Sequence, residues 1–453
     1  YRFTLDDNKD LLFIKKFLKM NMKIKNFSYN EIINYYQKNK SKFKFKPSAR
    51  DYGSKISYNN KLWDSALKVI PGGNSILSKR PDRFIKEDWP TYFSKAKGCY
   101  IWDINNTKYL DMSYMGVGTN VLGYSHPKIN KAVNKAIDNG NLSTLNSVEE
   151  IQLAKKLVSI HDWADMCKFT RSGGEANALA VRIARAYTRK DGICVCGYHG
   201  WHDWYIASNH KKINNLDKHL LKNISPIGVP KDYAKHIYTF NYNDSDYLEK
   251  ILIKNRNIGI IKMEVIRNIP PKPNFLKRVK ILAKKFNCVL IFDECTTGFR
   301  ENYGGIHLKY NINPDIAIFG KTLGNGFAIN AILGKSKIMN TAKRTFISST
   351  FWSERIGFTA ALKFLDIVNE EDYKDIIKKG QYVKGRWDKL FKKYKIKVDI
   401  GGIDSLPFFK LKKNHLIFKT FLTKEMLKNK ILSSDIIYIS TSHSFSLLDS
   451  YLK

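Results

Sequence analysis

The chain has 453 residues, of which 43% are hydrophobic and 13% are aromatic, and 78 Lys and Arg outnumber 41 Asp and Glu for a net charge of +37. This apolar content supplies a large core and excludes a wholly disordered or fibrous protein. At roughly 150 residues per domain the length favours two or three domains, and no run approaches the roughly 18 apolar residues that a membrane-spanning helix needs.

The excess of positive charge raises the hypothesis of a nucleic-acid-binding protein, because clustered cations neutralise phosphates. The lysines are instead scattered along the whole chain, as in "KKGQYVKGRWDKLFKKYKIKV". No block of cations with interleaved aromatic residues accompanies them, and no nucleic-acid motif does. A scattered basic surface is therefore the favoured interpretation, and we expect neither nucleic acid nor a membrane as partner.

Cysteine usage bears on the compartment and on metal binding. Most of the cysteines lie in apolar, strand-like runs, and none forms a paired CxxC pattern. We therefore expect reduced thiols in a cytoplasmic protein, with neither a disulfide nor a metal site. The six are Cys99, Cys167, Cys194, Cys196, Cys288 and Cys295.

Residues 1–60 are predicted to be an N-terminal extension and linker. An amphipathic stretch, "DLLFIKKFLKMNMKI", precedes a polar segment, "KNKSKFKFKPSARDYGSK". The opening "RFTLDDNKDLLFIKKFL" resembles the closing helix of a cytidylyltransferase-like sugar-nucleotide domain, where an Arg-x-Thr-x-Asp run precedes the last helix. It is either a remnant of such a domain or a plain extension.

From about Asn60 strands and helices are predicted in alternation. Residues 97–113, "KGCYIWDINNTKYLDMS", have alternate apolar residues around an Asn-Asn turn and predict a hairpin. Residues 126–140 and 147–161 have apolar residues at helical spacing, and in the second segment Ser147 and Glu150 have the spacing of a capping box.

Five short apolar runs follow, with helical segments at 175–189 and 275–287 between them. Buried strands that alternate with helices predict an α/β fold with a mostly parallel sheet covered on both faces. From about Gly357 the pattern becomes helix-rich and then mixed, which predicts a smaller C-terminal domain. The runs are "MCKFT" (166–170), "ICVCG" (193–197), "IGIIKME" (258–264), "CVLIFDE" (288–294) and "DIAIFG" (315–320).

Residues able to support chemistry follow several of these runs, where ligands bind in open α/β sheets. Ser172, Gly173 and Gly174 lead into a helix whose N-terminus favours a phosphate, although such a turn is often only structural. The next run ends in "YHGWHDW", which is either a packed corner or a platform for a flat ligand, with Tyr198 stacked on a ring.

Two further run ends carry charged side chains. Asp293 closes a buried run, where a carboxylate is costly without a partner; it either caps the loop, pairs with a cation or holds a protonated ring nitrogen. Lys321 lies in a Gly-rich turn, as a surface lysine or as an imine-forming amine. A phosphate site, a stacking ring, a carboxylate and such a lysine are together what pyridoxal 5′-phosphate (PLP) requires.

In order and spacing, the chain from about Trp63 to about Leu448 resembles the class III aminotransferases of PLP fold type I. Within that class it is most similar to glutamate-1-semialdehyde 2,1-aminomutase. The motifs that carry the resemblance are "VIPGGNS", "LGYSHP", "SGGEAN", "GYHG" and "FDECTTGFR". The resemblance implies an N-terminal segment of this fold at 61–110, a large PLP-binding domain with a seven-stranded, mostly parallel sheet at 111–355, and a small α+β domain at 356–453.

The resemblance also implies roles for single residues. Asp293 would keep the ring nitrogen protonated, and Lys321 would form the Schiff base and then move the proton. Thr350 would reach the phosphate bound in the neighbouring subunit, which implies a homodimer with shared active sites. The further cofactor-binding residues would be Gly173 and Gly174 at the phosphate, Tyr198 and Cys295 on the two ring faces, and Glu264.

Two departures from the family pattern stand out, of which the first concerns the local turn and the second the expected substrate. Val265 follows Glu264 where the family has Glu-Pro, and Ser78 stands where aminomutases have an arginine for the substrate carboxylate, with Lys79 and Arg80 just beyond. The expected activity is amino-group transfer to a small molecule, by an aminomutase or a transaminase. The alternatives are a transaminase acting on a sugar or other carbonyl in surface-glycan synthesis, a nucleic-acid-binding protein and a non-catalytic relative.

Overall fold

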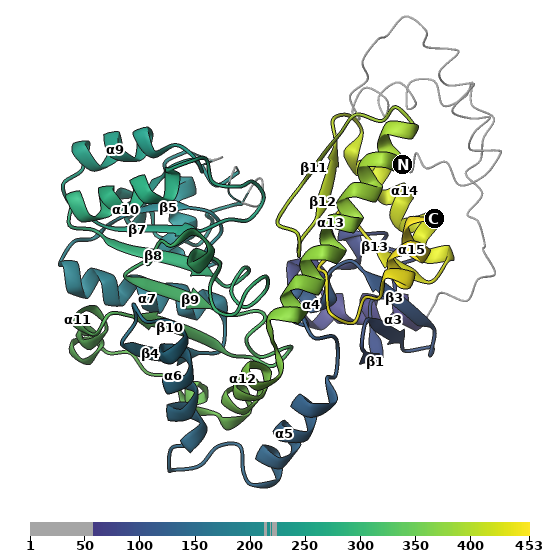
Figure 1. The fold of residues 1–453 in the computed structure, drawn as a ribbon, viewed down its shortest axis with the longest axis horizontal. Coiled ribbons are helices and arrows are strands. Elements are labelled where there is room, and N and C mark those ends of the chain that lie inside the picture. Colours follow the sequence, from purple (N-terminus) through teal and green to yellow (C-terminus); the bar gives the residue numbers. More distant parts are fainter. Residues whose placement is uncertain (1–57, 213–214, 218, 220–223) are drawn as a thin grey trace, which may run out of the picture. The chain divides into compact units, whose positions relative to one another are not determined.

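The computed structural model describes residues 58–212, 215–217, 219 and 224–453. The chain divides into two units, Tyr1–Lys61 and Leu62–Lys453. The predicted N-terminal extension, its amphipathic stretch and its cytidylyltransferase resemblance lie outside the described residues, apart from residues 58–60. The second unit carries the sheets described below (Figure 1).

A seven-stranded sheet is the largest sheet of the second unit, with the strand order β4-β10-β9-β8-β7-β5-β6. Only β10 runs antiparallel to its neighbours, so the predicted mostly parallel sheet is confirmed. The strands are β4 Met166–Thr170, β5 Gly192–Cys196, β6 Ile237–Thr239, β7 Ile258–Glu264, β8 Val289–Glu294, β9 Ile316–Phe319 and β10 Asn330–Gly334.

Two apolar layers cover the faces of this sheet because side chains alternate along each strand. On β7, Ile260 joins the buried cluster around helix α7, whereas Ile261 and Met263 join the cluster that includes helix α10. The helices are α3 Tyr58–Val69, α4 Met115–Gly118, α5 Pro127–Asp138, α6 Val148–Ile160, α7 Gly173–Thr188, α8 Asp203–Ile206, α9 Ser245–Lys254, α10 Phe275–Lys285, α11 Ser336–Met339, α12 Arg355–Ile367, α13 Glu370–Lys393, α14 His415–Lys428 and α15 Phe445–Leu452.

Two smaller sheets complete the second unit. The predicted hairpin is confirmed as β2 (Tyr100–Asp103) and β3 (Lys108–Met112), which lie in a sheet of order β1-β2-β3-β13 with β1 (Phe93–Lys97) and β13 (Ile431–Ser433). β13 pairs in parallel with β3, so residues from the two ends of this unit share one sheet. β11 (Val398–Gly401) and β12 (Phe408–Leu411) form a separate hairpin.

The capping box predicted at Ser147 is wrong. Ser147 is the N-cap of α6, but its side chain makes no capping hydrogen bond. The N–H of Glu150 instead donates to the backbone carbonyl of Ser147 at 3.4 Å. A capping box does form at the start of α7, where Ser172 and Glu175 bond reciprocally.

All six cysteines are free thiols. Within the described part of the chain, no helix has the length and apolar character needed to cross a membrane. The same residues contain no cluster of three or more side chains that could hold a metal ion.

Candidate active site

The carboxyl ends of parallel strands bring together most of the residues singled out above. β7 and β8 are neighbours, and their register pairs Glu264 with Asp293. Lys321 follows the end of β9 after one glycine, and Gly173 opens α7 shortly after β4. Because β4, β7, β8 and β9 run in the same direction, these residues lie along one edge of the sheet.

Asp293 is a buried carboxylate held from three sides. Its Oδ2 accepts a hydrogen bond from Nδ1 of His199 at 2.8 Å, and its Oδ1 accepts the N–H of Cys295 at 3.1 Å. Nζ of Lys262 lies 3.9 Å from Oδ2. Burial acts to raise the pKa of Asp293, but Lys262 and the hydrogen bond from His199 outweigh it and hold the pKa well below its usual range. The group is therefore an anion at neutral pH.

Both ring nitrogens of His199 face acceptors. Nδ1 lies 2.8 Å from Oδ2 of Asp293, and Nε2 lies 3.2 Å from the carbonyl of Cys196. Burial lowers the pKa of His199, against the opposing effect of the hydrogen bond to Asp293. We therefore assign the neutral tautomer with the proton on Nδ1, because the carboxylate is the nearer and stronger acceptor.

Lys321 lies in the turn after β9 and is half-buried. Its Nζ donates to Oγ1 of Thr296 at 2.8 Å. Thr296 is itself buried in the turn that follows β8, three residues after Asp293. The lysine amine is thus held in a defined place by a neighbouring strand end, as a nucleophile or proton carrier requires.

Tyr198 and Glu264 are joined where β5 and β7 end. The N–H of Tyr198 donates to Oε2 of Glu264 at 3.0 Å, and Nη1 of Arg267 lies 3.3 Å from Oε1 of the same carboxylate. Cζ of Arg267 also lies 6.0 Å from the centre of the Tyr198 ring. Burial acts to lower the pKa of Arg267, but Glu264 outweighs it and the pKa lies above its usual value. An aromatic face is therefore held beside a fixed positive charge.

The first turn of α7 leaves backbone donors for an anion. Oγ of Ser172 accepts the N–H of Glu175 at 3.3 Å, and the Ser172 carbonyl accepts that of Ala176 at 3.0 Å. The N–H groups of Gly173 and Gly174 are the remaining donors of this turn, since the first four N–H groups of a helix have no partner within it. Together with the helix dipole they suit a phosphate.

The two glycines also leave room for close approach. A Cβ at Gly174 would lie 3.0 Å from the ring of His202 and 3.2 Å from Nε1 of Trp201. A Cβ at Gly173 would lie 3.5 Å from Sγ of Cys295, which brings Cys295 next to the start of α7. These glycines therefore leave space that larger residues would fill.

Thr350 is not brought to the other predicted residues within this chain. It begins a short 3-10 helix, Thr350–Ser353, and is exposed. The neighbouring Phe351 is 66% exposed. The predicted role of Thr350 needs a second subunit and stays a prediction.

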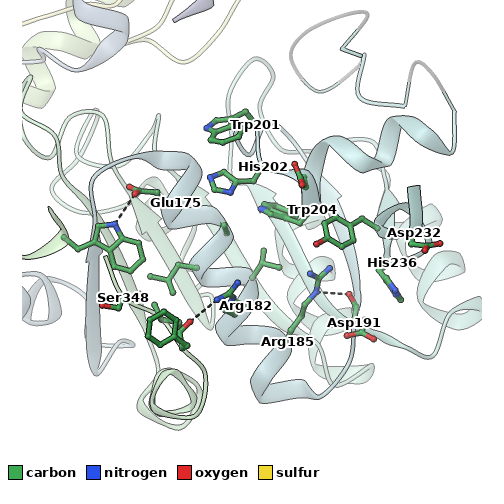
Figure 2. A pocket seen from close by; sticks show the side chains of 18 residues that line it. Glu175, Arg182, Arg185, Asp191, Trp201, His202, Trp204, Asp232, His236 and Ser348 are labelled. Atoms are coloured by element: carbon green, nitrogen blue, oxygen red, sulfur yellow. Dashed lines mark hydrogen bonds between the residues drawn. The ribbon is translucent and has the colours of Figure 1, made fainter. Parts of the chain in front are cut away.

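A surface groove of about 980 Å³ lies along α7 (Figure 2). Glu175, Trp201 and His202 line it, as does Phe346, whereas neither Lys321 nor Asp293 does. Trp201 is 71% exposed and Phe346 is 83% exposed. The groove is therefore a separate surface of mixed character beside the first turn of α7, with exposed aromatic side chains among charged ones.

Sequence reasoning missed four residues of this site: His199, Lys262, Thr296 and Arg267. His199 lies in the aromatic loop that was singled out, and Thr296 lies in "FDECTTGFR". Lys262 carries its own signal, because it interrupts the buried run "IGIIKME". A charge within such a run requires a partner, and this requirement could have marked Lys262 as a candidate residue.

The arrangement fits PLP on three structural observations. A glycine turn at a helix N-terminus has backbone donors and no side chain in the way. A buried carboxylate, Asp293, lies on the same edge of the sheet, two residues before Cys295, whose Sγ is next to Gly173. The amine of Lys321 is fixed by Thr296 in the next turn. The same set lacks the clustered His, Cys, Asp and Glu ligands of a metal centre among the described residues.

Comparisons with known proteins agree with this fit. The sequence profile of the family described as "Aminotransferase class-III" matches residues 85–424. The 3-aminobutyryl-CoA aminotransferase of Cloacimonas acidaminovorans is 31% identical over 370 residues, covering 80% of this chain and 85% of that protein. The glutamate-1-semialdehyde 2,1-aminomutase of Methanosphaera stadtmanae is 30% identical over 427 residues, covering 88% and 97%. Among solved structures, a FumI protein from a Sphingopyxis species in its PLP internal aldimine form has a TM-score of 0.78 at 22% identity, covering 87% of this chain and 94% of that chain.

Proposed function

The chain belongs to the class III aminotransferase family and is a PLP-dependent enzyme, and from this premise we propose that it moves an amino group from a primary amine to a separate carbonyl substrate. The observation that carries the proposal is the placement of Lys321, Asp293 and Tyr198 at strand ends along one edge of the sheet, each with its own fixing contact.

Bound PLP supplies an electron sink for the charge left when a proton leaves the amine-bearing carbon. In the proposal Lys321 would hold the cofactor through its Nζ, and the same amine, oriented by Thr296, would carry the proton. Asp293 would favour the protonated form of the ring nitrogen, and the ring of Tyr198 would cover one face of the cofactor.

The proposed phosphate site gives a direct prediction. Gly174→Ala places a Cβ against His202 and Trp201 at 3.0–3.2 Å, so we expect PLP to bind about tenfold more weakly. The measurement is titration of the cofactor-free protein with pyridoxamine 5′-phosphate. Gly385→Ala on α13 is the control, because its Cβ would meet nothing within 4 Å. Unchanged affinity in Gly174→Ala would remove this turn from the phosphate site.

The choice of a transaminase over an aminomutase rests on Ser78. Ser78 stands where the resemblance to aminomutases predicts an arginine, and it lines a cavity of about 790 Å³. A serine hydroxyl has no charge with which to pair a carboxylate. The neighbouring Arg80 is already bonded to Asp82 through two contacts of 3.0 and 3.1 Å. At the position where an aminomutase would have an arginine, this chain therefore offers no charge for a substrate carboxylate.

Arg267 is the proposed anion-binding group for the amino donor. Its guanidinium lies beside the Tyr198 ring and contacts Glu264 at 3.3–3.4 Å, longer than a strong charged hydrogen bond. We expect Arg267→Ala to raise KM for a carboxylate-bearing donor such as L-glutamate about tenfold or more, and to change KM for an uncharged amine little. Steady-state kinetics with both donors make the comparison. Equal changes for the two donors would contradict this role.

A homodimer is part of the proposal, as the resemblance implies. It is supported by exposed apolar side chains near the Thr350 loop, including Phe346 and Phe351, and by Trp201 in the groove of Figure 2. Exposed aromatic side chains such as these are enriched at protein interfaces. Sedimentation of the purified protein tests the oligomeric state.

The activity is tested by the visible absorption spectrum of the PLP-loaded protein before and after L-glutamate is added. We expect a yellow band that glutamate bleaches while 2-oxoglutarate accumulates. A band that persists would favour an aminomutase or another amine donor. No band after incubation with PLP would overturn the catalytic proposal in favour of a non-catalytic relative.

A further inference from the structure

Lys262 is a charged residue in an entirely buried strand. All seven residues of β7 are buried, and the side chain of Lys262 is 0% exposed. Its Nζ has no hydrogen-bond acceptor among the described residues. A buried ammonium group is costly unless it is paired with an anion and hydrogen-bonded. The residue therefore calls for an explanation beyond packing.

The register of β7 against β8 brings the side chain of Lys262 close to Asp293. Along β7, Lys262 lies on the same side as Glu264 and Ile260, the side covered by α7. The register opposes Lys262 to Ile291 and Glu264 to Asp293, so the lysine reaches toward the carboxyl end of β8. Its Nζ stops 3.9 Å from Oδ2 of Asp293.

Several titratable groups act on Lys262 at this point. Burial lowers the pKa of Lys262, and the carboxylates of Asp293 and Glu264 oppose that effect. Lys262 in turn lowers the pKa of His199, which is bonded to the same carboxylate. The carboxylate of Asp293 therefore already has two partners within this chain, the ammonium group of Lys262 and the imidazole of His199.

We propose that Lys262 is a positioning residue that shares the charge of Asp293 with the ring nitrogen of PLP, so that the ring nitrogen is held only partly protonated. This inference rests on the proposed function, in which Asp293 faces that nitrogen. Two cations at one carboxylate repel each other, and at about 4 Å in a partly buried site this repulsion is substantial. Lys262 therefore weakens the pull of Asp293 on the ring proton and sets how strong an electron sink the cofactor becomes.

The test uses pyridoxamine 5′-phosphate labelled with ¹⁵N in the ring, which binds without a covalent bond to Lys321. Its ring-nitrogen resonance and its dissociation constant are measured in the wild type and in Lys262→Met, a neutral side chain of similar length. We expect the resonance in the variant to move toward that of the protonated ring, and the affinity to rise about tenfold. Should Lys262→Met fail to fold, Lys262→Gln serves for the same measurement.

Two controls separate this role from a structural one. Lys379→Met removes another buried lysine, which pairs with Asp375 on α13, and should leave the resonance unmoved. In the Asp293→Asn background, Lys262→Met should lose its effect. If the resonance does not move in Lys262→Met, the proposal is wrong whatever the affinity does. If it does not move in Asp293→Asn alone, Asp293 does not face the ring nitrogen, and the proposed function fails at that residue instead.

Discussion

Replacing Lys321 with alanine is expected to lower kcat by about 10⁴-fold or more, because one change removes both the attachment amine and the proton carrier. Its Nζ is bonded to Thr296 at 2.8 Å, and no second lysine shares that contact among the described residues. Borohydride reduction of the PLP-loaded wild type should trap the cofactor on Lys321, and mass spectrometry should find no such adduct at this site in the variant.

The control for this change is Lys337→Ala, which removes an exposed lysine at the start of α11. It should keep full activity and the full adduct. Pyridoxamine 5′-phosphate should still bind to Lys321→Ala, because the glycine turn and Asp293 are intact. A variant that turns over at more than a few per cent of the wild-type rate would show that Lys321 is not the catalytic amine.

Much of the fold was predictable because its signals are local. The runs that became β4, β7 and β8 are short and apolar, and each ends at a polar residue or a turn. α7 and α10 pack on opposite faces of the sheet because successive side chains along those strands point to opposite faces. β10 was not predicted: it enters the sheet antiparallel between β4 and β9, and its sequence, "NAILG", does not encode which strands it pairs with.

The sequence likewise predicts some residues of the candidate site but not the contacts between them. The strand-end residues Asp293 and Lys321 could be found from sequence, because a parallel sheet gathers strand ends at one edge. The contact between Lys262 and Asp293 could not, since it depends on the register of β7 against β8. The failed capping box at Ser147 has a similar cause: the motif has the right residues, but the backbone carbonyl takes the N–H instead.

Replacing Asp293 with asparagine is expected to lower kcat by about 10³-fold at saturating cofactor, because a neutral amide no longer stabilises a protonated ring nitrogen. The change also affects the protein without cofactor. The substitution removes the carboxylate that pairs with Lys262 and that accepts the hydrogen bond of His199. Breaking a buried ion pair in this way lowers the free energy of unfolding by about 3–5 kcal/mol. Thermal unfolding of the cofactor-free protein measures the second effect, and single-turnover kinetics measure the first.

The pH dependence of this stability loss has a definite sign. The pKa of Asp293 is held below its usual value, so its charge stabilises the folded state above about pH 4 and this contribution is lost as the pH falls further. The stability difference attributable to Asp293 should therefore be constant from pH 6 to pH 8 and shrink in acid.

Asp315→Asn is the control that separates the loss of stability from the loss of catalytic rate, because it removes a paired carboxylate that we do not place in the active site. Asp315 pairs with Lys335 at 2.7 Å and accepts the N–H of Leu290, just before β9. We expect its loss to lower stability while kcat stays near the wild-type value. If Asp293→Asn behaved in the same way, with reduced stability and an unchanged rate, the carboxylate would be a structural partner of Lys262 and His199 alone. A rate loss that persists after cofactor saturation instead assigns Asp293 to the chemistry.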